Sequence, residues 1–166
     1  MKVSSLSKKD QTIAHASIAP SPRLVSAYID ASAIDSPKSK GIGTGLVLLG
    51  SLEPAPLYKE GVNIGPNQQV YNGELEAIAR ASEVIANRAL QGYSYRVYAD
   101  NQASLLRLAN LSDQPGQAQL IRVLQAYRTI VDRGAQLSFY WVPGHSGVIE
   151  NELVDSVAKE STSQKP

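Results

Sequence analysis

Residues 24–64 read LVSAYIDASAIDSPKSKGIGTGLVLLGSLEPAPLYKEGVNI. This segment contains three β-prone runs in succession, at residues 24–30, 41–49 and 56–64. A polar loop containing Asp35, Pro37, Lys38 and Lys40 separates the first two runs, and Gly65-Pro66 predicts a turn after the third. We therefore predict that the first strand ends at Asp30 and that the three strands form an antiparallel meander.

The apolar spacing changes from strand-like to helical beyond this segment. Helices are predicted over 71–90, 102–111, 118–131 and 148–160, and strands over 96–99 and 136–142. Strands that alternate with helices indicate parallel additions to an existing sheet. The sequence therefore predicts an α/β fold with a five-stranded mixed sheet, three antiparallel strands followed by parallel additions, flanked by helices.

The chain is long enough for one domain. Its 166 residues suit a single core, which we assign to residues 23–163, and the Ser-, Lys- and Pro-containing residues 1–22 are predicted to be a flexible tail or linker. The absence of cysteine excludes disulfides and zinc–thiolate sites. No apolar run approaches the roughly 20 residues that cross a bilayer, and no secretory signal is evident. We expect an intracellular protein, in the cytoplasm or nucleus, without membrane contact.

The net charge is nearly balanced. Lys and Arg total 16 and Asp and Glu total 15, which gives +1. A protein that binds nucleic acid without help from another domain usually has a basic excess, because neutralised phosphates supply most of the affinity. The net charge therefore favours either a weakly bound substrate or a neighbouring domain that binds the nucleic acid.

Four acidic residues occupy positions from which they can converge. Asp30 follows the first strand and Asp100 the fourth, and ligands in α/β sheets collect at the carboxyl ends of strands. Glu74 is predicted in the first turn of its helix, and Asp155 lies one helical turn after Asn151 in the last helix. Converging carboxylates raise one another's pKa or require a cation. Mg²⁺ or Mn²⁺ suits such an oxygen-only site, and two such ions support phosphoryl transfer.

Each acid also has a simpler interpretation. Asp30 could begin a turn, and Glu74 could offset a helix dipole. Asp100 could cap the helix that begins at Gln102, and Asp155 could face solvent. Taken singly, these interpretations are at least as good as catalysis, so the case for a site depends on the four acids occurring together.

Four sequence blocks carry a family resemblance. They are YIDAS at 28–32, GELEAI at 73–78, YADNQ at 98–102, and WVPGHSG at 141–147 followed by ENE at 150–152 and Asp155. In order and context they resemble the type 1 ribonucleases H, including the domains attached to reverse transcriptases, over residues 24–159. The last block is the most specific of the four.

The resemblance implies a ribonuclease H-like fold and a metal-dependent endonuclease that hydrolyses the RNA strand of RNA/DNA hybrids. It assigns two Mg²⁺ ions, with Mn²⁺ as a substitute, to Asp30, Glu74, Asp100 and Asp155. His145 would shuttle a proton or assist product release, as a group that titrates near neutral pH can. The substrate contacts that it implies are Gly43, Thr44, Asn72, Gln102 and Asn151. We expect the isolated domain to be a monomer.

The sequence also departs from some relatives. Where they insert a basic protrusion, this chain has only SDQPG at 112–116, and its N-terminal segment is too short for a basic hybrid-binding domain. Both departures agree with the +1 charge. They favour a domain from a retroelement polyprotein that serves reverse transcription with an attached reverse transcriptase.

Two other functional classes stay open. One is a catalytically silent module on the same fold, against which the presence of all four acids counts. The other is a DNA strand transferase or resolvase, which the block at residues 141–155 disfavours.

Overall fold

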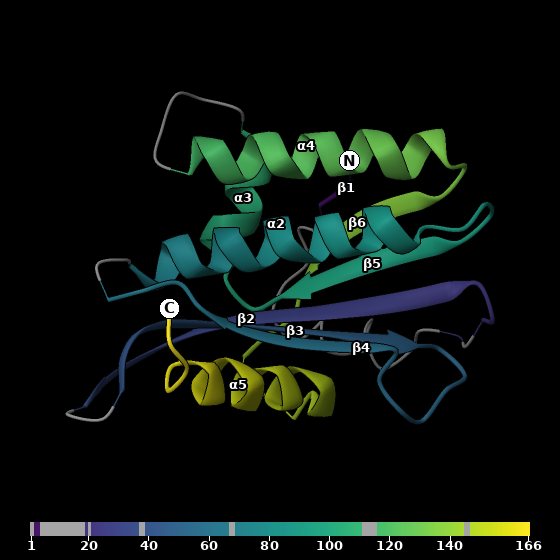
Figure 1. The fold of residues 1–166 in the computed structure, drawn as a ribbon. Helices are drawn as coiled ribbons and strands as arrows, with labels where there is room; N and C mark the ends of the chain where they lie inside the picture. The colour runs from purple at the N-terminus through teal and green to yellow at the C-terminus, as the bar shows by residue number, and fades with distance from the viewer. Residues whose placement is uncertain are drawn as a thin grey trace.

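The protein is built around one mixed sheet. The computed structural model describes residues 2–3, 19, 21–36, 39–66, 69–110, 116–144 and 147–166. The sheet has the order β1-β6-β5-β2-β3-β4 (Figure 1). Its strands are β1 (Lys2–Val3), β2 (Leu24–Ser36), β3 (Ser39–Gly50), β4 (Tyr58–Asn63), β5 (Ser94–Ala99) and β6 (Gln136–Trp141).

The strand directions follow the predicted division. β2, β3 and β4 are antiparallel neighbours, whereas β5 and β6 add to β2 in parallel. The predicted five-stranded mixed sheet is confirmed. The two-residue β1 pairs with β6 within the segment predicted to be a tail, and most of that segment lies outside the described residues.

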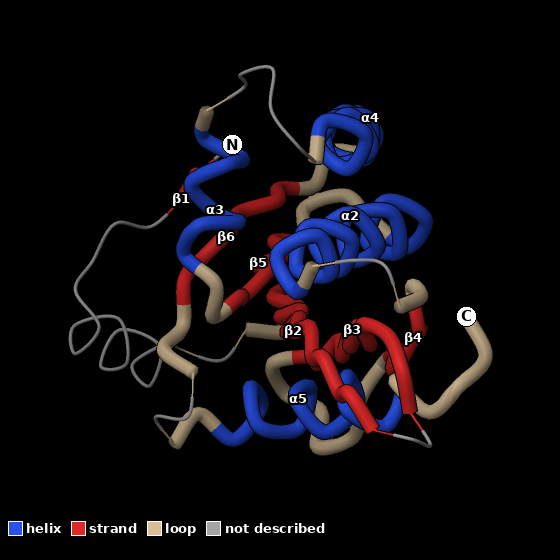
Figure 2. The backbone as a smooth tube through the Cα atoms, turned by 90° about the vertical axis from the view of Figure 1, so that its left-hand side faces the viewer, coloured by secondary structure: helices blue, strands red, loops and turns tan. Residues whose placement is uncertain are grey.

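Helices cover the sheet unequally on its two faces. Helices α2 (Val70–Arg88), α3 (Gln102–Ala109) and α4 (Gln117–Asp132) lie on one side, and α5 (Ile149–Ser161) lies on the other (Figure 2). The larger core includes Ile29, Ile78 and Phe139 on the α2 side, and a smaller one around Val47 and Val154 lies under α5. None of the described helices is long and apolar enough to cross a membrane.

The predicted end of β2 at Asp30 is wrong. β2 continues to Ser36 and stays paired with β3, whose first residue is Ser39; Pro37 and Lys38 of the predicted polar loop lie outside the described residues. The parallel pairing of β2 with β5 stops at Tyr28, but the antiparallel pairing with β3 continues beyond it. Asp30 therefore lies within a strand, just beyond the point where that strand loses one of its two partners.

Glycines in β3 allow α5 to pack closely. A Cβ at Gly45 would lie 2.6 Å from the Val154 carbonyl oxygen, and one at Gly43 would collide with the Ala158 carbonyl oxygen. The predicted strand GIGTG thus brings α5 close enough to the sheet for side chains of that helix to reach the edge where Asp30 lies.

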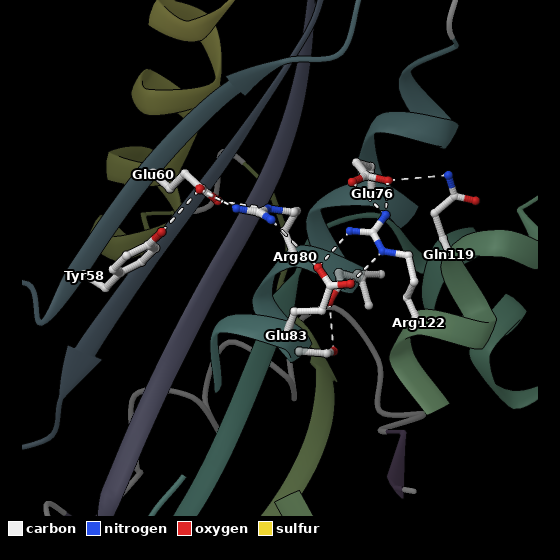
Figure 3. A network of polar contacts seen from close by, with 9 residues as sticks. Tyr58, Glu60, Glu76, Arg80, Glu83, Gln119 and Arg122 are labelled. Carbon is white, nitrogen blue, oxygen red and sulfur yellow. Dashed lines mark hydrogen bonds and ion pairs between the residues drawn. The ribbon is translucent and has the colours of Figure 1, made fainter. Parts of the chain in front are cut away.

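A charged network holds α4 on α2 (Figure 3). Arg122 pairs with Glu76 and Glu83 at 2.7 Å each, and Arg80 connects α2 to Glu60 of β4 at 2.6 Å. Because the Arg122 guanidinium is engaged by two carboxylates, it stabilises the helix pair and does not extend into solvent as a free cation.

Candidate active site: a carboxylate cluster

Three of the four predicted acids converge. Asp30, Glu74 and Asp100 each place a carboxylate oxygen within 4.8 Å of the others. Asp30 lies in β2, Asp100 directly follows the neighbouring parallel strand β5, and Glu74 lies in α2. The expectation that adjacent parallel strands bring two carboxylates to one sheet edge is met by this geometry.

Glu74 lies deeper than the sequence suggested. α2 begins at Val70, so Glu74 belongs to the second turn and its predicted place in the first turn is wrong. Its side chain is buried against β2, where Oε1 accepts the Ala31 amide at 3.0 Å; that amide also donates to Asp30 Oδ1 at 2.8 Å. A group so placed does not face solvent at a helix end, which removes the helix-dipole interpretation.

Gly73 allows this burial. A Cβ at this position would lie 2.5 Å from Ile42 Cγ2 and 2.9 Å from the Ala31 Cβ. A larger residue would lift the start of α2 from the sheet and carry Glu74 away from Asp30. Gly73 stands within the GELEAI block, but no role was predicted for it from the sequence.

The electrostatics of the cluster call for a cation. Burial, with the Asp100 carboxylate and then Asp155, raises the pKa of Asp30 to about 7. Burial and the charges of Asp30 and Asp100 also raise the pKa of Glu74 well above its ordinary value. The buried Glu74 Oε2 has no hydrogen-bond partner among the described residues. An unpaired buried carboxylate is costly, so the arrangement fits a bound divalent cation with oxygen ligands.

Asp100 is held by the WVPG segment and is not a helix cap. The N-cap of α3 is Asn101, whose Oδ1 accepts the Ser104 amide at 3.0 Å, so the capping interpretation of Asp100 is wrong. Trp141 Nε1 donates to the Asp100 carbonyl at 2.9 Å. A Cβ at Gly144 would lie 2.5 Å from Asp100 Oδ2.

Trp141 and Gly144 are site residues that sequence reasoning missed. Neither residue received a role of its own from the sequence. The signal available was that both belong to the most specific block of the resemblance. Their contacts indicate that this block fixes the segment around Asp100 as well as leading into the His145 loop.

Asp155 stands beside the cluster. It lines the same open cleft, of about 440 Å³, as Asp30, Glu74 and Asp100. Asp155 interacts with Asp30, but it is not part of the group of three mutually close carboxylates found in the described residues. Its Oδ2 pairs with Lys159 Nζ at 2.5 Å. The solvent-facing interpretation of Asp155 is therefore wrong, because its carboxylate is half-buried and engaged.

The remaining predicted residues are dispersed. His145 lies outside the described residues. Gln102 is exposed at the first position of α3, and Asn72 is half-buried in the first turn of α2. Three residues are buried and do not line the cleft as the described residues define it: Gly43, Thr44 and Asn151.

Comparison with known proteins identifies the family. Residues 22–163 match the family model described as RNase H. The chain belongs to the ribonuclease H family. This membership confirms the predicted ribonuclease H activity at the level of the family. No curated protein matches the chain significantly.

Solved ribonucleases H share the fold. RNase H1 from the halophilic archaeon Halobacterium salinarum is 20% identical with a TM-score of 0.60, and the match covers 83% of this chain and 96% of that one. LC11-RNase H1, isolated from compost by a metagenomic approach, is 18% identical with a TM-score of 0.66, covering 84% and 96%. LC11-RNase H1 was also solved in complex with an RNA/DNA hybrid, and that structure matches with a TM-score of 0.63, 18% identity and coverage of 83% and 96%.

A further match is the N-terminal RNase H domain of a Mycobacterium tuberculosis protein. It is 13% identical with a TM-score of 0.66, covering 84% of this chain and 98% of that one. At identities this low, the structural similarity shows a common ribonuclease H-like fold and no finer property.

Proposed function

We propose that this ribonuclease H hydrolyses the RNA strand of RNA/DNA hybrids, with Asp30, Glu74, Asp100 and Asp155 holding two Mg²⁺ ions. The observation that carries the proposal is the cluster of three carboxylates within 4.8 Å, one of which has a buried oxygen with no hydrogen-bond partner among the described residues. Oxygen ligands alone suit Mg²⁺, and Mn²⁺ as its substitute.

When bound, two such ions supply an activated water and stabilise the leaving oxygen of a phosphodiester. The chain's own contribution is to hold the ligands rigidly. The Ala31 amide fixes Asp30 and Glu74 together, and Trp141 fixes the backbone at Asp100. We assign proton transfer or product release to His145, because an imidazole titrates near neutral pH.

The hybrid is the proposed substrate. LC11-RNase H1, which shares the fold, was solved with such a hybrid. An A-like hybrid presents its 2′-hydroxyls in a wide, shallow minor groove, which allows contacts that do not depend on sequence. We assign Asn72 and Gln102 to these contacts. Gly43, Thr44 and Asn151 are buried, so substrate contact at these three would require β3 or α5 to move.

The test is cleavage of an end-labelled RNA/DNA hybrid in Mg²⁺, beside RNA and DNA duplexes. We expect cleavage of the hybrid's RNA strand only, and its loss in EDTA and in Asp100→Asn. Asp132→Asn is the matched control, because Asp132 is exposed at the end of α4, away from the cleft. Cleavage of the DNA duplex would favour the strand transferase alternative. No cleavage in Mg²⁺, Mn²⁺ or low salt would leave two explanations: a missing hybrid-binding domain, or the silent module.

We propose further that the domain serves reverse transcription within a larger retroelement polyprotein. The net charge of +1 and the short SDQPG segment support this context. If an attached domain supplies most of the affinity for the hybrid, hybrid binding by this chain alone should be weak at physiological salt and strengthen when the salt concentration is lowered. Tight binding by the isolated chain at physiological salt would contradict the proposal.

A further inference from the structure

A lysine lies within the acidic cleft. Lys159 follows Asp155 by one turn of α5 and lines the same cleft as Asp30 and Asp100. Its ammonium contacts Asp155 Oδ2 at 2.5 Å. Lys159 is the one basic residue among the described residues that line this cleft. It therefore supplies the local positive charge for four acidic side chains.

Asp155 interacts both with Lys159 and with the acidic cluster. Asp30, Glu74 and Asp100 are mutually close, whereas Asp155, though it interacts with Asp30, is turned to Lys159. A carboxylate oxygen that pairs closely with an ammonium is less available to a divalent cation, and two cations at one carboxylate repel each other. Lys159 and a metal ion thus compete for Asp155.

The lysine is also free to change partner. Its side chain is 50% exposed, compared with 23% for that of Asp155. A lysine has a flexible four-carbon stem, so its ammonium can move several ångströms while α5 stays fixed. Phosphate oxygens form strong charge-assisted hydrogen bonds with ammonium groups, so a phosphodiester that enters the cleft offers a new partner.

We propose that Lys159 is a tethered counter-cation that neutralises Asp155 in the metal-free protein, yields it to the incoming metal ion and then pairs with a substrate phosphate. This role rests on the proposed function, because it assumes that the cleft binds divalent ions and then a nucleic acid. No bond is made or broken in the exchange, since only ionic partners change. Lys159 is thus a competitor of the metal for Asp155 and a contact for the substrate.

The experiment compares wild type with Lys159→Gln, Lys159→Arg and Lys59→Gln. Lys59 is exposed on β4, so its substitution removes the same charge elsewhere. Mg²⁺ binding to the substrate-free proteins is measured by calorimetry. Hybrid cleavage is measured at saturating Mg²⁺ over a range of salt, and circular dichroism checks that each variant is folded.

We expect two opposite changes in Lys159→Gln. Its Kd for Mg²⁺ should fall about two- to fivefold, the range that corresponds to losing one exposed ion pair. Its KM for the hybrid should rise about threefold or more, and the slope of log kcat/KM against log salt should become shallower by about one. Lys159→Arg should restore both parameters toward wild type, and Lys59→Gln should change neither.

Each part of the inference can fail separately. An unchanged or higher Kd for Mg²⁺ in Lys159→Gln would overturn the competition for Asp155, and would leave the lysine as an ordinary surface partner. An unchanged KM and salt slope would overturn the transfer to a phosphate. The calorimetry needs no catalysis, so a failure of wild type to cleave the hybrid would contradict the proposed function without deciding the competition for Asp155.

Discussion

Replacing Asp100 with asparagine should change stability and activity in opposite directions. Asp100 is one of three carboxylates within 4.8 Å, and its charge raises the pKa of both Asp30 and Glu74. The neutral amide keeps the size of the side chain but removes the repulsion. In metal-free solution we therefore expect Asp100→Asn to be more stable than wild type, although it should not cleave the hybrid.

The size of the gain follows from the separation of the charges. Two unit charges 4.8 Å apart repel each other by about 3.5 kcal/mol at an effective dielectric constant of ~20. The cluster is only partly ionised near neutral pH, so about 1–2 kcal/mol should be recovered at pH 8. For a chain of this length, that corresponds to a rise in Tm of about 3–6 °C.

The gain should depend on pH with a definite sign. The pKa of Asp30 is about 7 in the folded protein, above its ordinary value of 3.8. The folded state therefore binds more protons than the unfolded state between these values, and stability falls as pH rises through them. The difference between these two pKa values corresponds to a loss of roughly 4 kcal/mol in the free energy of unfolding of the metal-free wild type, once Asp30 is ionised. Asp100→Asn should thus gain most at pH 8 and little at pH 4, where the Asp30 and Glu74 carboxyls are protonated.

Urea unfolding of EDTA-treated wild type, Asp100→Asn and Asp132→Asn at pH 4 and pH 8 measures the effect. Adding Mg²⁺ at pH 8 should stabilise wild type more than Asp100→Asn, because the variant has lost a ligand. Asp132→Asn should behave as wild type. Equal or lower stability of Asp100→Asn at pH 8 in EDTA, or a gain of the same size at pH 4, would refute the electrostatic reasoning.

Three further substitutions test the packing around the site. Gly144→Ala should weaken Mg²⁺ binding by about tenfold in calorimetry with the fold intact, because its Cβ would displace the Asp100 carboxylate. An unchanged Kd for Mg²⁺ would mean that the added Cβ does not move this carboxylate. Gly45→Ala should lower the free energy of unfolding by about 2 kcal/mol or more, since its Cβ would meet the Val154 carbonyl oxygen, and an unchanged urea midpoint would contradict this. Arg122→Ala should lower the free energy of unfolding by about 1–2 kcal/mol in urea, because Glu76 and Glu83 of α2 each lose their shortest ion pair, while kcat for the hybrid stays at the wild-type value.

Much of the architecture was predictable from local patterns. The helices end within about two residues of the predicted bounds, because apolar spacing and glycine stops are encoded locally. The order of strands and helices likewise predicted a mixed sheet. The convergence of Asp30 with Asp100 followed from one general rule about parallel strands.

The errors arose where distant segments determine the outcome. β2 continues past Asp30 because β3 still pairs with it, a tertiary fact that the sequence of β2 does not contain. Gly73 and Gly144 are required by side chains that lie far away in the chain, Ile42 and Asp100. Asp155 lines the cleft with the other acids, and its pair with Lys159, one turn along the same helix, is a local contact that was not predicted.

The way β2 passes the end of β5 has a consequence for variation in length. Side chains alternate between the two faces of a strand, so a shift of one residue moves every side chain beyond it to the opposite face. An insertion of one residue before Tyr28, where β2 is paired on both sides, would carry Asp30 away from Glu74 and Asp100. Beyond Ala33, β2 and β3 form a hairpin arm that can lengthen or shorten without changing the position of any of these carboxylates. The number of residues in β2 before Asp30 is therefore constrained in this enzyme. The number of residues in the hairpin arm beyond Ala33 can vary.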